Sequence, residues 1–416
     1  MPEIPGKAVA LVGMRRSGKT WRLFDEMRSL HERGVPRGRM LYLNLEDDRL
    51  GPMDTATLDT ALEVFFRRDP AARTEGSWIF LDEIQVVSGW ERFARRVLDT
   101  ERARLVVTGS SARLLSTEVA TAFRGRAFTV EVLPFNVREA ARAEGLDPSH
   151  EGWPPSAPLR SRLDASIAAY LEQGGFPSVH ALHPWERVQI LQGYVDLVIL
   201  RDVAERHGAI NLAVLRELVA ALFSANAGGF SVSRLHGALV SQGWKVGKAT
   251  LLAYLQHLVD SFLVFLVPLR TRSARQRAVN PRKVYAVDPG LAAALYRAGA
   301  RNQGAQLENA VYLELRHRLG RLAEGAVSWV KTSAGHEVDF AVDDPVHGGS
   351  PTLIQVCVSL ADPATRAREI QALTEAMGET GATRATVVTL HEQGRIASPT
   401  GPIDIIPARE FFFRRV

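Results

Sequence analysis

The sequence predicts a multidomain α/β protein that begins with a three-layer P-loop core. Over residues 1–135, apolar runs of strand length alternate with segments that carry apolar residues at helical spacing. The segment GMRRSGKT, Gly13–Thr20, fits the G-x-x-x-x-G-K-[S/T] pattern of a phosphate-binding loop. The segment WIFLDEIQ, Trp78–Gln85, is an apolar strand that ends in two acidic residues. Together these features predict a nucleotide-binding domain built on parallel strands.

Four positions of the loop have a role in holding phosphate. Gly13 and Gly18 allow the backbone to curl, so that successive N–H groups point toward phosphate oxygens. Lys19 supplies a positive charge for the β- and γ-phosphates, and Thr20 offers a hydroxyl to Mg²⁺. An apolar strand before the loop and a helical segment after it give the context that the motif requires. We therefore predict ATP and Mg²⁺ as ligands.

Three further residues, Arg15, Arg16 and Ser17, lie inside the loop and are assigned to the nucleotide site. The two arginine side chains either point outward or reach the phosphates. The sequence leaves both orientations open.

The acidic pair at the end of the second motif has the placement of a Walker B strand. Asp82 would hold Mg²⁺ through water, and Glu83 would polarise the attacking water. Both residues end a strand at the sheet edge where ligands of parallel α/β folds bind. The alternative is that this Asp-Glu pair only caps a strand before a turn.

The composition of the chain limits the classes of protein to which it can belong. The chain has 416 residues, of which 46% are hydrophobic, enough for sizeable cores in about two to four domains. Its formal net charge of +5 is compatible with nucleic acid but does not establish it. The single cysteine, Cys357, excludes an internal disulfide framework and a cysteine-based zinc site. The start of the chain lacks a signal-peptide layout and the longest apolar stretch is interrupted by polar residues, so we expect a cytoplasmic protein without a membrane span.

We expect four regions along the chain. Residues 1–135 form the P-loop core, 136–206 a helical lid, 207–270 a winged helix and 271–416 a second α/β domain. The core strands are predicted at Ala8–Val12, Met40–Leu45, Trp78–Leu81, Leu105–Thr108 and Phe128–Val132.

The winged helix is predicted from the segment Phe230–Leu269. Its pattern gives a helix, a turn, a second helix and a strand. The second helix is expected to expose Lys245, Lys248, Thr250 and His257, which would suit a DNA groove. The alternative is that the domain is a protein–protein spacer.

A basic run, RTRSARQRAVNPRK, follows the predicted winged helix at Arg270–Lys283. Its members Arg275 and Arg282 are candidates for contact with DNA phosphates. A solvated linker would have the same composition.

The last region contains an incomplete set of nuclease residues. Metal-dependent nucleases of the PD-(D/E)xK type place a Glu on a helix, an Asp on a strand, and Glu-x-Lys on the next strand. Glu308 and Asp339 fill the first two places, whereas Gln355 and Cys357 replace the carboxylate and the lysine. We therefore expect a nuclease-like fold with impaired or absent cleavage. Lys331 is a candidate substitute lysine, although nothing in the sequence shows that it serves as one.

The chain resembles, over nearly its whole length, a prokaryotic family of predicted AAA+-like ATPases. That family carries a C-terminal domain of unknown function with a restriction-endonuclease-like core. The segments that carry the resemblance include the two motifs above together with LYLNLEDDRL at Leu41–Leu50, VVTGSSARLLSTEVATAFRGRAFTVEVLPF at Val106–Phe135, YLEQGGFP at Tyr170–Pro177 and NPRKVYAVDPGL at Asn280–Leu291.

The resemblance implies roles for further residues. Asn44 would lie near Glu83 and restrain it until a partner binds. Thr108, Ser110 or Ser111 would sense the γ-phosphate. Arg124 or Arg126 would be an arginine finger that acts on a neighbouring subunit of a homo-oligomer. A surface salt bridge is the alternative role for these two arginines.

Three functions remain open at this point. The first is a Mg²⁺-dependent ATPase that acts on DNA, such as branched or mobile-element DNA, as a motor or switch. The second is a regulatory ATPase that acts on a protein partner. The third is a nuclease that is gated by ATP.

Overall fold

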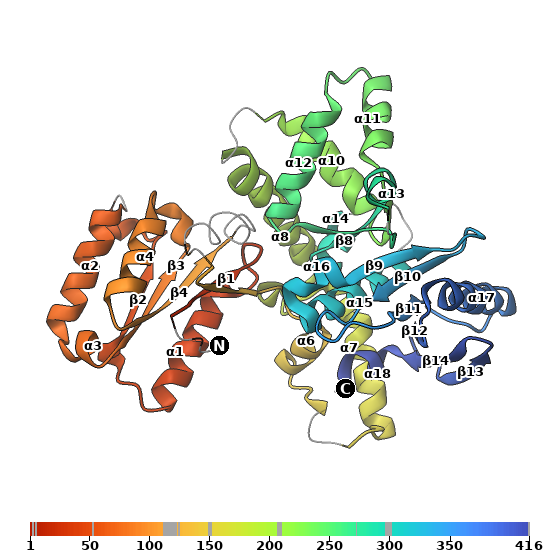
Figure 1. The fold of residues 1–416 in the computed structure, drawn as a ribbon, viewed down its shortest axis with the longest axis horizontal. Coiled ribbons are helices and arrows are strands. Elements are labelled where there is room, and N and C mark those ends of the chain that lie inside the picture. Colours follow the sequence, from red (N-terminus) through yellow and green to blue (C-terminus); the bar gives the residue numbers. More distant parts are fainter. Residues whose placement is uncertain are drawn as a thin grey trace. The chain divides into compact units, whose positions relative to one another are not determined.

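The computed structural model describes residues 1, 4, 6–51, 54–110, 123, 125–148, 152–205, 210–271, 273–295 and 302–414. The chain divides into two compact units (Figure 1). The first unit comprises Met1–Leu133 with Asp260–Phe262, and the second comprises Pro134–Val259 with Leu263–Val416. No helix among the described residues is long and apolar enough to cross a membrane.

The first unit is built on a five-stranded parallel sheet with the strand order β2-β3-β4-β1-β5. Its strands are β1 Ala8–Val12, β2 Met40–Asn44, β3 Ser77–Asp82, β4 Ala103–Gly109 and β5 Ala127–Glu131. All five strands lie where the alternating pattern predicts them, within two residues at either end. β1 is buried along its whole length, because neighbouring strands flank it and helices cover the sheet.

Helices cover the faces of this sheet (Figure 1). Leu23 and Leu30 of α1 pack into one core with Leu11 of β1 and Phe80 of β3. These two leucines lie seven residues apart on one face of the helix. The helices of the unit are α1 Lys19–Glu32, α2 Thr55–Arg68, α3 Ala71–Thr74 and α4 Trp90–Thr100. The predicted α/β core is therefore confirmed.

The second unit begins with helices that pack on later helices of the same unit. Its first helices are α6 Val137–Ala143, α7 Ala157–Gln173, α8 Pro184–Leu197, a π-helical turn at Val198–Ala204 and α10 Leu212–Ser224. Both α7 and α8 pack against α14, Pro289–Leu295, and α7 also contacts α18, Ala408–Phe413. The segment predicted as a lid thus shares its core with the end of the chain.

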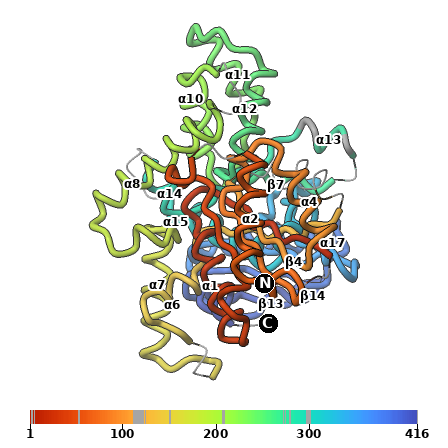
Figure 2. Tube along the Cα trace, turned by 90° about the vertical axis from the view of Figure 1, so that its left-hand side faces the viewer, coloured from red at the N-terminus to blue at the C-terminus, as the bar shows by residue number. Residues whose placement is uncertain are grey.

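A small three-stranded sheet with helices follows. Its elements are β6 Gly228–Phe230, α11 Val232–Ser241, α12 Lys248–Asp260, β7 Val264–Val267, α13 Ala274–Val279 and β8 Arg282–Ala286. β8 pairs antiparallel with both β6 and β7. This sheet therefore extends past residue 270, where the sequence places a domain boundary. Figures 1 and 2 both show α10, α11 and α12 side by side.

The last part of the chain forms a six-stranded mixed sheet with the order β13-β14-β12-β11-β10-β9. The helix α15, Gln303–Leu319, precedes it, and α17, Pro363–Thr380, lies between β11 and β12 and packs on both of these strands. The strands are β9 Val327–Lys331, β10 Glu337–Val342, β11 Thr352–Val356, β12 Arg384–Thr389, β13 Gly394–Ser398 and β14 Gly401–Pro407. β11 ends at Val356, one residue before Cys357.

A buried carboxylate joins two glycine-containing segments of the second unit. Asp288 is fully buried and accepts hydrogen bonds from the backbone N–H of Gly175, at 2.5 Å, and of Leu291, at 2.8 Å. A Cβ atom at Gly175 would lie 1.9 Å from the carbonyl oxygen of Phe135, and one at Gly290 would lie 2.1 Å from that of Gln173. Only glycine permits these close approaches of the backbone. The GGFP segment, Gly174–Pro177, and the DPG segment, Asp288–Gly290, therefore pack together in one arrangement, the GGFP–DPG joint.

We predict that this joint makes the stability of the second unit depend on pH. Burial raises the pKa of Asp288 from 3.8 to about 6, against the effect of its backbone donors. The folded state therefore holds the proton more tightly than the unfolded chain, and the stability contributed by this group is lost as pH rises through 6. The rise in pKa corresponds to about 3 kcal/mol. Urea denaturation at several pH values measures the effect.

The variant Asp288→Asn should lack this titration. The unfolding free energy of the wild type relative to that of Asp288→Asn should fall between pH 4 and pH 7. Asp404→Asn, at a half-exposed carboxylate paired with Arg395, is the matched control and should keep the wild-type slope. Equal slopes for the wild type and Asp288→Asn would contradict the prediction.

Candidate nucleotide-binding site

The two predicted motifs meet at the carboxyl edge of the parallel sheet in the first unit. The loop Gly13–Thr20 connects β1 to α1, and Asp82 ends β3. β4 lies between β1 and β3 in the sheet, and it ends at Gly109. Because parallel strands share one carboxyl edge, the loop, the acids and the residues at the end of β4 converge.

The backbone of the phosphate-binding loop depends on the two glycines of the motif, as the sequence predicts. A Cβ atom at Gly13 would lie 2.1 Å from the carbonyl oxygen of Val132, so only glycine fits. Gly18 has φ 106° and precedes the first turn of α1 without a side-chain cap. The free N–H groups of a helix start are suited to anions.

Lys19 is held inside the loop. Its side chain is only 4% exposed, and Nζ donates to the carbonyl oxygens of Gly13, at 3.2 Å, and Met14, at 3.1 Å. The same nitrogen lies 3.6 Å from Oε1 of Glu83. The lysine and the proposed catalytic glutamate therefore form an ion pair across the place where the phosphates would enter.

Asp82 is the centre of a hydroxyl cluster, which consists of Thr20, Tyr42 and Thr108. Thr20 Oγ1 donates to Oδ2 at 2.7 Å, and the Tyr42 hydroxyl donates to the same oxygen at 3.2 Å. Thr108 Oγ1 donates to Oδ1 at 2.5 Å. Burial and the charge of Asp82 raise the pKa of Tyr42, so its hydroxyl remains a donor. The sequence analysis did not select Tyr42.

Glu83 is positioned by its backbone and by two neighbours. It has φ 56° and ψ 50°, a left-handed conformation that few non-glycine residues adopt. Its N–H donates to Thr108 Oγ1 at 2.8 Å, and its Oε2 accepts from Gln85 Nε2 at 2.5 Å. Thr108 thus contacts both motif acids. The Glu83 side chain is restrained by Gln85, two residues along the chain, and by its ion pair with Lys19.

Asn44 does not supply the restraint that the resemblance implied. Its Oδ1 accepts from the backbone N–H of Glu46 at 3.1 Å and stabilises the turn after β2. Asn44 lies beside Asp82 in the sheet register, which explains its proximity to the site without a bond to Glu83.

The loop arginines differ in their surroundings. Arg15 pairs with Glu46 at 3.0 Å, and Arg16 is exposed with φ 65°. Ser17 has a buried hydroxyl for which the described residues provide no hydrogen-bond partner. This unsatisfied hydroxyl, the bare backbone at Gly13 and the Lys19 ammonium fit a phosphate group. Thr20 and Asp82 supply the oxygens that suit Mg²⁺.

Two of the expected residues lie directly next to core strands. Ser110 is fully buried directly after β4. Arg126 precedes β5 and pairs with Asp99 at 2.5 Å, and this pairing raises the pKa of Arg126 through its hydrogen bond. Its surface ion pair matches the alternative role considered for it. Ser111 and Arg124 lie outside the described residues.

The residues predicted to contact DNA lie in the second unit. Lys245, Lys248 and Thr250 are exposed at the start of α12. Arg275 on α13 and Arg282 on β8 are exposed in and after the connection between β7 and β8. The five residues thus lie in and near the helices and strands of the three-stranded sheet of the second unit.

The nuclease-like residues meet around a lysine that the sequence analysis did not select. Lys283 Nζ lies 2.9 Å from Oε1 of Glu308 and 2.7 Å from Oδ1 of Asp339. Lys331, the candidate substitute, is exposed at the end of β9. No spacing rule links residue 283 to the motif, because it lies on a strand of another sheet.

The other two residues of that set serve local packing. Gln355 Oε1 accepts from the Asp339 N–H at 3.2 Å, and its Nε2 donates to Glu369 at 2.7 Å. Cys357 lies just beyond β11 rather than inside an apolar strand, and its Sγ donates to the carbonyl oxygen of Ser359 at 3.0 Å. Burial raises the pKa of the Cys357 thiol, so it is expected to remain neutral.

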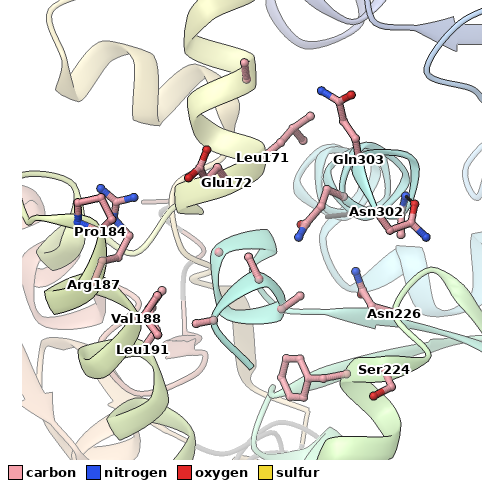
Figure 3. Close-up of a pocket in the computed structure, with 18 residues that line it drawn as sticks. Leu171, Glu172, Pro184, Arg187, Val188, Leu191, Ser224, Asn226, Asn302 and Gln303 are labelled. Carbon is pink, nitrogen blue, oxygen red and sulfur yellow. Dashed lines mark hydrogen bonds between the residues drawn. The ribbon is translucent and has the colours of Figure 1, made fainter. Parts of the chain in front are cut away.

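A separate cavity of about 690 Å³ lies in the second unit (Figure 3). On the side of α7 and α8, the apolar Leu171 and Leu191 line the cavity together with the charged Glu172 and Arg187. The carboxamides of Asn226, Asn302 and Gln303 also line it. None of the residues predicted from motifs lines it.

Two protein-family models match parts of the chain. Residues 5–141 match the model of an AAA domain family. Residues 164–303 match the model of a domain of unknown function, DUF8612. This second match ends at residue 303, so the restriction-endonuclease-like core expected for the region after it stays a prediction.

Solved structures give only distant likenesses. A Walker-type ATPase of Pyrococcus abyssi is 15% identical, with a TM-score of 0.45, over 69% of this chain and 90% of that chain. The ORC1 protein of Aeropyrum pernix in complex with DNA is 18% identical, with a TM-score of 0.29, over 70% of this chain and 87% of that one.

Two curated relatives match most of the chain. An uncharacterized protein of Haemophilus influenzae is 28% identical over 80% of this chain and 83% of its own length. The uncharacterized protein MJ1544 of Methanocaldococcus jannaschii is 30% identical over 90% of this chain and 79% of its own length. The chain therefore belongs to the same family as MJ1544, and its first unit is an ATPase domain of the AAA type.

Proposed function

We propose that the protein is a Mg²⁺-dependent ATPase whose nucleotide cycle drives action on DNA as a motor or switch. The observation that carries the ATPase proposal is the Asp82 hydroxyl cluster. Thr20 from the phosphate-binding loop and Thr108 from the end of β4 both donate to the one carboxylate of Asp82. This arrangement supports a site of hard oxygen ligands for Mg²⁺ next to the predicted phosphate-binding loop.

The chain's own residues divide the chemistry of hydrolysis between them. Lys19 holds the β- and γ-phosphates once it leaves the loop carbonyls, and Thr20 and Asp82 hold Mg²⁺. The ion, when bound, neutralises charge on the phosphate oxygens. Glu83 orients the attacking water and accepts its proton. Thr108 fixes Glu83 by accepting its backbone N–H, so it acts as a positioning residue.

In this structure Glu83 is engaged by Lys19 and Gln85. A nucleotide that attracts Lys19 removes one of these two contacts and frees a carboxylate oxygen for water. This arrangement supports a glutamate that becomes competent after the nucleotide binds. An arginine supplied by a neighbouring subunit, Arg124 or Arg126, would then complete the site in a homo-oligomer. For Arg126 this requires release from Asp99.

The DNA part of the proposal rests on the small domain of the second unit. Its element order, α10, β6, α11, α12, β7, α13 and β8, with sheet order β6-β8-β7, supports a winged helix. The helix α12, which follows α11, exposes Lys248 and Thr250, and the connection between β7 and β8 exposes Arg275. Cations on a helix and on the adjacent strand connection suit phosphate contacts.

A protein partner is the second candidate, and a specific observation favours it. Val240 is 50% exposed at the end of α11 and Leu252 is 48% exposed on α12. These two helices therefore also expose large apolar side chains, which suit a protein surface more than a phosphate backbone. The ATP-gated nuclease is disfavoured, because Gln355 replaces a carboxylate and Lys283 already occupies the remaining pair.

We predict that Lys19→Ala abolishes ATP binding, because the loop then lacks the buried ammonium that is expected to contact the β- and γ-phosphates. Glu83→Gln should retain ATP binding and lower turnover by about 10² to 10⁴, the usual range for loss of a positioned base. Nucleotide titration followed by a phosphate-release assay separates the two effects. Arg28→Ala, at an exposed position of α1, is the matched control. Unchanged turnover in Glu83→Gln would remove this residue from its role.

We predict that Thr108→Val lowers kcat with little change in KM, because both motif acids lose their shared hydroxyl while the phosphate loop stays intact. The expected loss is about 10- to 100-fold, equal to about 1.4–2.7 kcal/mol. Thr100→Val, at an exposed threonine bonded only within α4, is the control. A change in KM alone would contradict the positioning role.

We predict that DNA stimulates ATP turnover, and that the form of DNA identifies its substrate class. Turnover is measured with duplex, single-stranded and four-way-junction DNA at two salt concentrations. Lys245→Ala combined with Lys248→Ala should weaken stimulation and reduce its salt dependence, whereas Lys331→Ala should not. No stimulation by any form would favour the protein partner, for which Leu252→Asp is the corresponding variant.

A further inference from the structure

A lysine and two carboxylates meet inside the second unit. Lys283 lies on β8, Glu308 on α15 and Asp339 on β10. The ammonium lies 2.9 Å from Glu308 Oε1 and 2.7 Å from Asp339 Oδ1. Lys283 is 5% exposed and Asp339 is 6% exposed. A single ammonium therefore bridges two carboxylates that are largely removed from water.

Each carboxylate is also held by groups other than the lysine. Glu308 Oε1 accepts from the Tyr285 hydroxyl at 2.7 Å. Asp339 Oδ2 accepts from the backbone N–H of Val356 at 2.9 Å, and its own N–H donates to Gln355. These bonds do not involve Lys283. The two carboxylates are therefore oriented toward one another by the fold itself.

The charges at this place do not balance. Two carboxylates face one ammonium, at 2.9 Å and 2.7 Å from its nitrogen. A buried position with surplus negative charge favours a cation, and a divalent cation would compensate it more fully than an ammonium does.

We propose that the Lys283 ammonium is the built-in cation of the Glu308–Asp339 pair and closes this pair to divalent metal ions. Removal of the ammonium opens the pair to a hard divalent cation of the Mg²⁺ or Mn²⁺ class, which takes carboxylate and water oxygens as ligands. Lys283 thereby also ties β8 of the three-stranded sheet to α15 and β10. This inference does not depend on ATP hydrolysis or on DNA.

The test is a Mn²⁺ titration of the full chain by calorimetry at pH 7.5, without nucleotide. Lys283→Met keeps the apolar part of the side chain and deletes its charge. We expect this variant to bind one more equivalent of Mn²⁺ than the wild type, and its thermal midpoint to rise with Mn²⁺ more than that of the wild type. Any Mn²⁺ at the nucleotide site is common to both proteins, so the difference reports on the pair.

Matched variants assign the additional ion to this position. Lys283→Met combined with Asp339→Asn should lose the additional equivalent, and Lys283→Arg should not gain it. Lys331→Met, at an exposed lysine of β9 in the same unit, should behave as the wild type. If Lys283→Met does not fold, Lys283→Gln removes the charge while it retains a hydrogen-bond donor, and the same gain is expected.

Two results would overturn the proposal. In the first, Asp339→Asn alone removes one Mn²⁺ equivalent from the protein that retains Lys283, which would show that the lysine does not exclude the ion. In the second, a neutral variant at position 283 folds with the wild-type melting cooperativity and binds no additional Mn²⁺. Even where both neutral variants at position 283 are unstable, the Asp339→Asn comparison can overturn the proposal, because it tests whether the protein that retains Lys283 binds Mn²⁺ at this pair.

Discussion

The Asp82 carboxylate is the interaction on which the nucleotide site depends. It is 2% exposed, and its two oxygens accept from hydroxyls that belong to the phosphate-binding loop, to β2 and to β4. A buried carboxylate is costly unless its lone pairs are satisfied. Because these donors come from the phosphate-binding loop, β2 and β4, the acid is stabilised only where these three segments meet.

The same network connects binding to catalysis. Thr108 donates to Asp82 and accepts from the N–H of Glu83, so one hydroxyl fixes both acids relative to the loop. The left-handed backbone at Glu83 is a strained choice for a non-glycine residue, and such strain persists only where surrounding bonds over-determine it. The contacts from Lys19 and Gln85 then define the state of the glutamate in this structure.

The second unit uses buried charges for a different purpose. Asp288 joins the loop after α7 to the start of α14, and Lys283 joins β8 to α15 and β10. In both cases one charged group satisfies partners from segments that are distant in the sequence. Such contacts specify one packing arrangement, because a displaced segment would leave a buried charge without a partner.

The sequence by itself determined the five strands of the first unit, the phosphate-binding loop and the acid pair, because each is a contiguous pattern with its own periodicity or spacing. It also singled out Glu308 and Asp339 as two members of one nuclease-like set of residues. Only the tertiary structure decided that Tyr42 and Thr108 share Asp82, that Gln85 rather than Asn44 bonds Glu83, and that Lys283 lies between the two carboxylates. The hydrogen bond from Gly175 to Asp288 spans 113 residues and Lys283 lies 56 residues from Asp339, so no local pattern encodes these contacts. They arise because strand order and helix packing bring distant side chains into a dry interior, where each buried charge requires a partner.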